Sequence, residues 1–199
     1  MSRPHLYLAS TSPRRRELLA QLGIEVEVVS QGVTENRLAG ESPELYVKRL
    51  ALEKARSGLN GLAGKTLYPV LGADTAVVVE GEVLGKPVDK SDALVMLQRL
   101  SGRSHRVLSA VAVVGRDNLG QDREAMRISE SLVKFRAIIE KECEAYCNTN
   151  EPMDKAGAYA IQGKAALFIE RIEGSYSGVM GLPLFETGEL LQIFGIEIS

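Results

Sequence analysis

The sequence is poor in the residues that build metal clusters and disulfide frameworks. It contains only two cysteines, Cys143 and Cys147, and two histidines, His5 and His105. The cysteines are spaced like neighbours on one helix face, and two isolated histidines cannot complete a four-ligand zinc set with them. We therefore expect two reduced, half-buried thiols that pack inside a cytoplasmic protein.

Long apolar runs are also missing. The longest ones, at 76–79 and 110–114, are far shorter than a membrane-spanning helix requires. The N-terminal residues lead directly into a strand-like segment, without the apolar core and cleavage site of a signal peptide. These features predict a cytoplasmic protein that has no membrane partner.

Neither sign of charge dominates the chain. Lys and Arg number 24 against 26 Asp and Glu, which gives a net charge of −2. This balance provides no general attraction to nucleic acid or to an acidic membrane, so any anion site must be a local cluster. With 199 residues, 45% apolar and 25% charged, the chain is predicted to form one α/β domain over residues 1–199.

Hydrophobic patterning alternates between the strand period and the helix period. Strands are expected over 5–10, 24–29, 69–74, 77–80, 82–84, 106–114, 126–136 and 165–172. Helices are expected over 13–22, 43–58 and 91–102, around 139–146, and from 183 onward, with serine caps before the first two and at the start of the third. A polar loop is predicted over 31–41 and a linker within the fold over 59–68.

The first chemically distinctive segment is Ser10–Arg16, at the junction of an expected strand and helix. It combines hydroxyl groups, unpaired N–H groups of a helix N-terminus, and the guanidinium groups of Arg14 and Arg15. A helix N-terminus carries about half a positive charge, and arginine forks match phosphate oxygens two at a time. Cations here oppose the helix dipole, so a bound anion would explain them; a solvated basic face is the alternative.

A second feature is the carboxylate of Asp74, which ends an otherwise apolar strand and is followed by Thr75. Burying an unpaired charge is costly, so we expect a metal ion, a lysine or hydrogen-bond donors beside it. The ends of strands are where α/β proteins build active sites. A turn or capping role is the alternative.

Other polar residues become candidates only as members of a group. Lys86 lies between a glycine and a proline that fix its backbone, and the preceding hairpin would turn it toward Asp74. Glu35 and Lys54 would by themselves be ordinary surface residues. Gln162 carries an amide that donates and accepts at once, which suits a base edge, although a structural role is more common in a loop.

Common catalytic and nucleotide-binding motifs are absent. The sequence has no Walker A loop, no Gly-x-Gly-x-x-Gly run after a strand and no Gly-x-Ser-x-Gly elbow. His5 and His105 have no obvious partners for a catalytic triad. A nucleotide site in this chain would therefore have to be of another kind.

Six ordered segments carry a resemblance to a known family. They are Leu8–Arg15, Arg49–Ala55, Gly72–Thr75, Gly85–Pro87, Asp154–Gly163 and Gly181–Leu184. Over most of its length the chain resembles the Maf family of nucleoside triphosphate pyrophosphatases. The resemblance implies a mixed-sheet α/β fold of two lobes around a central cleft, similar to inosine triphosphate pyrophosphatases, and a homodimer.

Membership also implies a reaction: hydrolysis of a nucleoside triphosphate between its α and β phosphates, with a divalent cation. Mg²⁺ is the expected ion, with Mn²⁺ or Co²⁺ as alternatives. The subfamily similar to dTTP/UTP pyrophosphatases carries the residues found here as Arg14, Thr75 and Gln162. These three residues are therefore expected to select dTTP, UTP and modified pyrimidine nucleotides, which would suit a house-cleaning enzyme.

The remaining roles follow from this resemblance together with the charges. We expect Ser10, Arg14, Arg15, Lys54 and Lys86 to bind the phosphates, Asp74 to be catalytic, and Asp74 with Glu35 to hold the metal. Whether Asp74 acts chiefly as a base or as a metal ligand stays open. Two alternatives also stay open: a 7-methyl-GTP pyrophosphatase, and a nucleotide-sensing regulator of cell division or septum formation.

Overall fold

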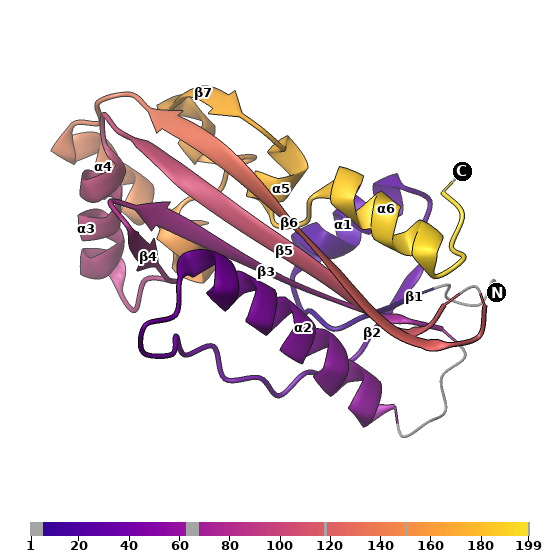
Figure 1. Ribbon diagram of the computed structural model, residues 1–199. Helices are drawn as coiled ribbons and strands as arrows, with labels where there is room; N and C mark the ends of the chain where they lie inside the picture. Colours follow the sequence, from indigo (N-terminus) through magenta and orange to yellow (C-terminus); the bar gives the residue numbers. More distant parts are fainter. Residues whose placement is uncertain (1–5, 63–67, 118, 150, 199) are drawn as a thin grey trace.

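The structure is a computed structural model and describes residues 6–62, 68–117, 119–149 and 151–198 (Figure 1). His5, where the first strand was expected to begin, lies outside the described residues, as does part of the predicted linker over 59–68. No helix in these ranges is both long enough and apolar enough to cross a membrane.

Within the described residues, one mixed sheet of seven strands organises the fold, in the order β2-β1-β3-β5-β6-β7 with β4 added to β3. β1 pairs in parallel with β2 and β3, and the other pairs are antiparallel. The mixed-sheet α/β prediction is therefore confirmed. The strands are β1 Leu6–Leu8, β2 Val26–Val28, β3 Val70–Val79, β4 Glu82–Leu84, β5 Ser104–Arg116, β6 Asp122–Phe135 and β7 Ile169–Glu173.

Helices cover both faces of this sheet (Figure 1). The α-helices are α1 Pro13–Gln21, α2 Pro43–Gly61, α3 Lys90–Leu100, α4 Glu140–Cys147, α5 Tyr176–Met180 and α6 Leu184–Ile193. The part of the chain that the structure describes also contains short 3-10 helices: η1 Glu151–Asp154, η2 Ala156–Ala158 and η3 Lys164–Phe168. Proline opens both α1 and α2, and the Ser42 side chain caps α2 by accepting from the N–H of Leu45.

The alternation of side chains along β3 divides the core. Its even-numbered apolar residues, such as Val70 and Ala76, pack with α2 on one face of the sheet. On the other face, Leu71 and Ala73 pack in a cluster with α1 and α6, whereas Val77 and Val79 pack in a second cluster with α3 and α4. Thr75 has the same parity as the residues of both clusters and lies between them in sequence. β5 crosses from one cluster to the other.

A break in strand pairing along one edge of β3 positions the site. β1 pairs with β3 as far as Leu71, and β4 pairs with β3 from Val77 onward. Between these points, residues 72–76 have β5 as their partner on the other edge, and no described strand pairs with them on this one. The carboxyl ends of β1 and β4 both point into this break, which brings the residues that follow them together.

Some of the local predictions are wrong. Asp74 does not end a strand: β3 runs unbroken from Val70 to Val79, because β5 pairs continuously with it and sets Ala110 opposite Asp74. The predicted strand over 165–172 is a 3-10 helix as far as Phe168 and a strand only afterwards. Asp89 caps α3, accepting from the N–H of Asp92, in place of the expected Ser91.

Candidate active site

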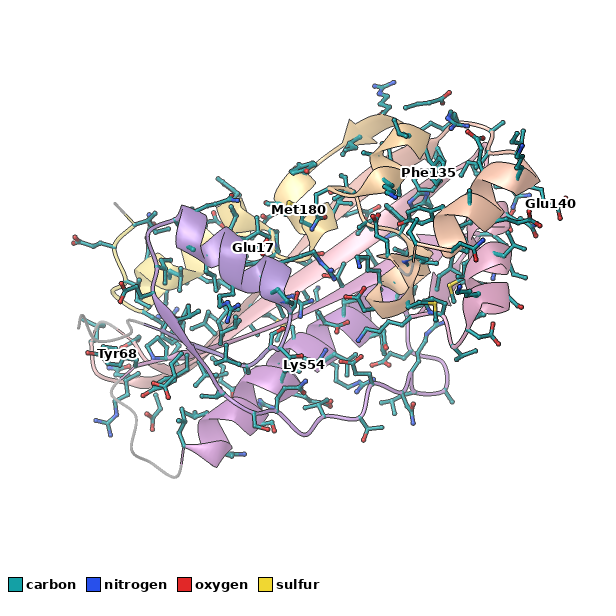
Figure 2. All side chains as sticks on the ribbon, turned by 180° about the vertical axis from the view of Figure 1, so that it is seen from behind. Glu17, Lys54, Tyr68, Phe135, Glu140 and Met180 are labelled. Carbon is teal, nitrogen blue, oxygen red and sulfur yellow. The ribbon has the colours of Figure 1, made fainter. Side chains whose placement is uncertain are left out.

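A cavity of about 270 Å³ opens at the break in the pairing of β3. All of the site residues predicted from the sequence line it, although they come from segments far apart in the chain. They are Ser10, Arg14, Arg15, Glu35, Lys54, Asp74, Thr75, Lys86 and Gln162. Figure 2 labels Lys54 on α2 and Met180 on α5, two elements that reach the cavity from opposite faces of the sheet.

Lys54 joins two of the carboxylates that line the cavity, those of Asp74 and Glu35. Its Nζ donates to Asp74 Oδ1 at 2.7 Å and pairs with Glu35 Oε1 at 2.5 Å. Lys54 and Asp74 are buried, with 4% and 6% of their surfaces exposed, whereas the Glu35 side chain is 41% exposed. A buried lysine and a buried aspartate need such pairing, because either charge alone would be costly to remove from water.

The surroundings move the pKa values of the two carboxyl groups in opposite directions. Burial raises the pKa of Asp74 and outweighs the attraction of Lys54 and Arg15, which acts to lower it. Burial also disfavours the charged form of Glu35, but Lys54, Lys86 and Arg15 together outweigh it and lower the pKa of Glu35. Such a separation is typical of two carboxyl groups that have different chemical tasks. Asp74 is the better proton acceptor of the two, and Glu35 the more permanent anion.

Arg15 is held by a fork of hydrogen bonds at the start of α1. Its Nε donates to the carbonyl of Gly181 at 2.8 Å, Nη1 to Ser10 Oγ at 3.1 Å, and Nη2 to Thr75 Oγ1 at 3.4 Å. Thr75 in turn shares a 2.9 Å hydrogen bond with Ser109 Oγ, which donates to a carbonyl of α5. The network fixes one guanidinium group in the cavity wall before any anion binds.

Arg14 and Lys86 are more loosely held. Arg14 Nη1 lies 3.5 Å from Asp154 Oδ2, and the Asp154 side chain is 64% exposed. The expected approach of Lys86 to Asp74 is replaced by a longer pairing with Glu35, at 4.0 Å between Nζ and Oε2. Both cations line the cavity with weak partners, so both are available to an anion that enters it.

The start of α1 adds a further attraction for an anion. Ser12 is the N-cap residue, but its side chain makes no capping hydrogen bond, and the first turn contains no acidic residue. The helix therefore presents unpaired N–H groups and its positive end at the cavity wall. Together with the arginine and lysine side chains, this end makes the cavity suited to a polyanion.

Sequence reasoning gave no role to several residues of this region. Asp154, Lys155 and Tyr159 line the cavity, and Ser109 supports Thr75 from the neighbouring strand. The glycine at position 157 was a sequence signal that this segment packs closely against another part of the chain. The structure gives the reason: a Cβ there would lie 2.9 Å from methyl carbons of Val77 on β3. The role of Ser109 had no such signal, since it depends on the register between β3 and β5.

The two carboxylates also provide the oxygen donors that a divalent cation prefers. No group of three or more His, Cys, Asp or Glu side chains arranged for a metal ion occurs within the described ranges. Mg²⁺ is commonly bound by one or two carboxylates, with water and substrate phosphates completing its shell. Asp74 and Glu35, which share one lysine, fit an ion that binds together with a phosphate substrate.

Comparison with known proteins gives the following matches. Residues 5–194 match the family model described as Maf-like protein. The chain is 54% identical over 198 residues to a dTTP/UTP pyrophosphatase of Alkalilimnicola ehrlichii, covering 98% of this chain and 95% of the relative. It is 52% identical over 201 residues to a dTTP/UTP pyrophosphatase of Aromatoleum aromaticum, covering 96% and 95%. A solved Ham1 protein of Staphylococcus aureus matches 95% of this chain and 96% of its own, at 12% identity and a TM-score of 0.44.

Proposed function

The chain belongs to the Maf-like protein family, and from this premise we propose that it is a nucleoside triphosphate pyrophosphatase acting on dTTP and UTP. Water would be added at the α phosphorus, the bond to the β-phosphate oxygen would break, and the monophosphate and pyrophosphate would leave. The observation that carries the proposal is the convergence of one buried carboxylate and several cations in a single cavity.

The cations of the cavity would bind the triphosphate and stabilise the leaving group. Arg15 is fixed in place, so it would offer oriented N–H donors without reorganisation. Arg14 and Lys86 would exchange their weak carboxylate partners for phosphate oxygens. Pyrophosphate leaves with additional negative charge, and positive groups near it lower the barrier.

Asp74 would act on the attacking water. Its raised pKa makes it a stronger base than an exposed aspartate, and Lys54 holds its Oδ1 in place. The carboxylate would accept one proton from the water as the oxygen bonds to phosphorus. Glu35, whose pKa is lowered, would remain ionised through the same step.

Asp74 and Glu35 would also hold a divalent cation, for which we propose Mg²⁺. When bound, such an ion neutralises phosphate charge and polarises the phosphoryl oxygens. Lys54 pairs with both of these carboxylates, so it holds their oxygens close to each other.

The base would be selected by Arg14, Thr75 and Gln162, which line the same cavity as the phosphate-binding cations. These residues match the dTTP/UTP pattern, and all three line the cavity. The two relatives named dTTP/UTP pyrophosphatase are each more than half identical to this chain, which supports the same preference. We further propose that residues 1–199 act as one domain, in a cytoplasmic homodimer with a house-cleaning role.

Replacing Asp74→Asn tests the assignment directly. This change keeps the size of the side chain and one oxygen acceptor for Lys54, but it removes the basic carboxylate. We expect pyrophosphate release from dTTP to fall by at least about 1000-fold with an unchanged fold, because general base catalysis and metal binding are lost together. Circular dichroism and thermal unfolding would verify the fold. Near-normal turnover by a folded variant would rule out the mechanism.

The same assay with a set of nucleotides separates the alternatives. The wild-type protein is expected to release pyrophosphate from dTTP and UTP faster than from CTP or 7-methyl-GTP. A preference for the methylated purine would reject the assignment to Arg14, Thr75 and Gln162. If no triphosphate were hydrolysed while nucleotide raised the melting temperature, a sensing role would replace the enzymatic one.

A further inference from the structure

The amide of Gln162 is placed only through its backbone. Its side chain makes no hydrogen bond to any other residue that the structure describes, and it lies exposed at the cavity. A long side chain without partners cannot define its own position, because several rotamers are open to it. Gln162 lies in the turn formed by residues 160–164. The position of its amide therefore depends on how firmly the backbone of this turn is held.

Two residues outside the cavity hold this turn on both sides of Gln162. Tyr146 Oη accepts a hydrogen bond from the backbone N–H of Ala160 at 3.3 Å, on the N-terminal side. Glu151 Oε2 accepts one from the N–H of Lys164 at 3.2 Å, on the C-terminal side. Tyr146 also donates to Glu151 Oε1 at 2.8 Å, so the two side chains form one unit.

The pair formed by Tyr146 and Glu151 also packs closely against the turn. A Cβ atom on Gly163 would lie 2.0 Å from Glu151 Oε1, so only glycine allows the turn to rest on the carboxylate. Gly163 N–H donates to the carbonyl of Ala160 at 3.1 Å, which closes the turn around Gln162. Tyr146 is buried, and its ring packs edge-on against Phe168 with 5.5 Å between centroids.

The role inferred here for Tyr146 and Glu151 rests on the proposed function, because it concerns the choice of base at the same site. We propose that Tyr146 and Glu151 are positioning residues that fix Gln162 and thereby determine which nucleobase is accepted. Neither residue lines the cavity, so neither is expected to contact the nucleotide.

Arg15, Lys54 and Asp74 lie on other elements. Arg14 also lies on another element, but its partner Asp154 belongs to η1, the 3-10 helix that begins at Glu151. Tyr146→Phe leaves the sequence of η1 unchanged and is therefore the primary variant.

A pair of nucleotides with the same sugar and nearly the same shape provides the readout. Thymine and cytosine differ in where their edges donate and accept, and thymine also carries a 5-methyl group, which an amide does not recognise. The part of the discrimination between dTTP and dCTP that comes from the edge requires an amide at a fixed position. Tyr146→Phe removes both hydrogen bonds of the hydroxyl while keeping the ring. We expect the ratio of kcat/KM for dTTP over dCTP to fall about tenfold, mainly through KM for dTTP, with kcat within about twofold.

A double-mutant cycle separates positioning from general damage. In a Gln162→Ala background, Tyr146→Phe is expected to change the ratio by less than about twofold, because the amide it positions is no longer present. Equal effects of Tyr146→Phe in both backgrounds would overturn the proposal. So would a loss of selectivity on Tyr146→Phe when Gln162→Ala alone has no effect.

A second variant keeps the test decisive if Tyr146→Phe folds poorly. Glu151→Gln keeps only one oxygen acceptor for two donors, so it is expected to lower the same ratio by about fivefold. Glu144→Gln, an exposed residue of α4 with the same change of charge, is the matched control and should leave the ratio unchanged. A wild-type protein that does not distinguish dTTP from dCTP would refute the proposed base selection itself. Selectivity that survives Tyr146→Phe and Glu151→Gln would refute only the positioning role.

Discussion

At the scale of single residues, burial is the main influence on the protonation of Asp74 and His105. Asp74, Lys54 and His105 all lie almost completely out of water. Asp74 and Lys54 meet that constraint by pairing with each other, and His105 meets it through a contact with Tyr159. The sequence was sufficient to name candidate residues that turn out to line one cavity, since charge and family pattern are local. Their partners could not be predicted, because the pairing of Lys54 with both carboxylates depends on segments that meet only in the folded chain.

His105 shows how burial controls the protonation of a residue behind the cavity wall, next to Tyr159. Its Nε2 lies 2.8 Å from Tyr159 Oη, its ring packs against Phe135, and Nδ1 has no hydrogen-bond partner among the described residues. Burial lowers the pKa of His105 from 6.5 to about 4. The folded protein therefore keeps this imidazole neutral through the weakly acidic range.

This shift predicts acid-sensitive stability. The unfolded chain binds a proton below pH 6.5 and the folded chain only below about pH 4, so stability is full above 6.5 and falls between these values. The loss attributable to His105 should reach about 3 kcal/mol. Urea unfolding at pH 7, 5.5 and 4.5 would measure it. The His105→Phe variant should have lower stability at pH 7 but a shallower slope, and an unchanged slope would exclude His105 as the cause.

The packing of secondary-structure elements brings the residues of the cavity within contact distance of one another. α2 lies against β3 closely enough that Lys54 reaches Asp74, and this closeness depends on Gly72. The helices and most strands could be predicted from periodicity and caps. The continuity of β3 could not, because the polar pair Asp74-Thr75 has the pattern of a strand end, and only pairing with β5 shows otherwise.

Gly72→Ala should therefore disturb both stability and activity. The added Cβ would lie 2.3 Å from the carbonyl oxygen of Ala51 and 2.5 Å from the nitrogen of Ala55, and the helix backbone must move. We expect a cost of about 3 kcal/mol, a melting temperature lower by about 10 °C, and a reduced kcat/KM because Lys54 shifts with the helix.

Gly61→Ala is the control within the same helix. A Cβ there meets no atom of the described residues within 4 Å, so thermal unfolding should be unchanged or occur at a slightly higher temperature. Equal behaviour of Gly72→Ala and Gly61→Ala in both unfolding and turnover would show that the contact between α2 and β3 does not set the site.

At the scale of the whole molecule, the cavity is assembled from nearly the full length of the chain. Its lining begins at Ser10 and ends at Gly181, and it lies where two core clusters on one face of the sheet separate at Thr75. The resemblance to a known family predicted a central cleft. The break in pairing along β3 that creates it is a property of the sheet order, which local patterning does not contain.

Nucleotide binding should therefore slow amide hydrogen exchange at the same time in segments that lie far apart in the sequence. A non-hydrolysable analogue of dTTP with a methylene bridge between the α and β phosphates, added with Mg²⁺, should slow amide exchange around residues 10–15, 154–163 and 179–181. Amide exchange in α3, which contributes no lining residue, should change little and provides the internal control. Protection confined to one of the three segments would contradict a single shared site.

The unbroken passage of β5 through both core clusters has a mechanical consequence. Val107 packs in the cluster with α3 and α4, and Val111 and Val113 pack in the cluster with α1 and α6, all on one continuous strand. One continuous strand thus connects the two core clusters. A hinge motion that moved the clusters apart would break the backbone hydrogen bonds that β5 makes with its neighbours. We therefore expect nucleotide and product to enter and leave through small movements of residues that line the cavity, such as the separation of Arg14 from Asp154.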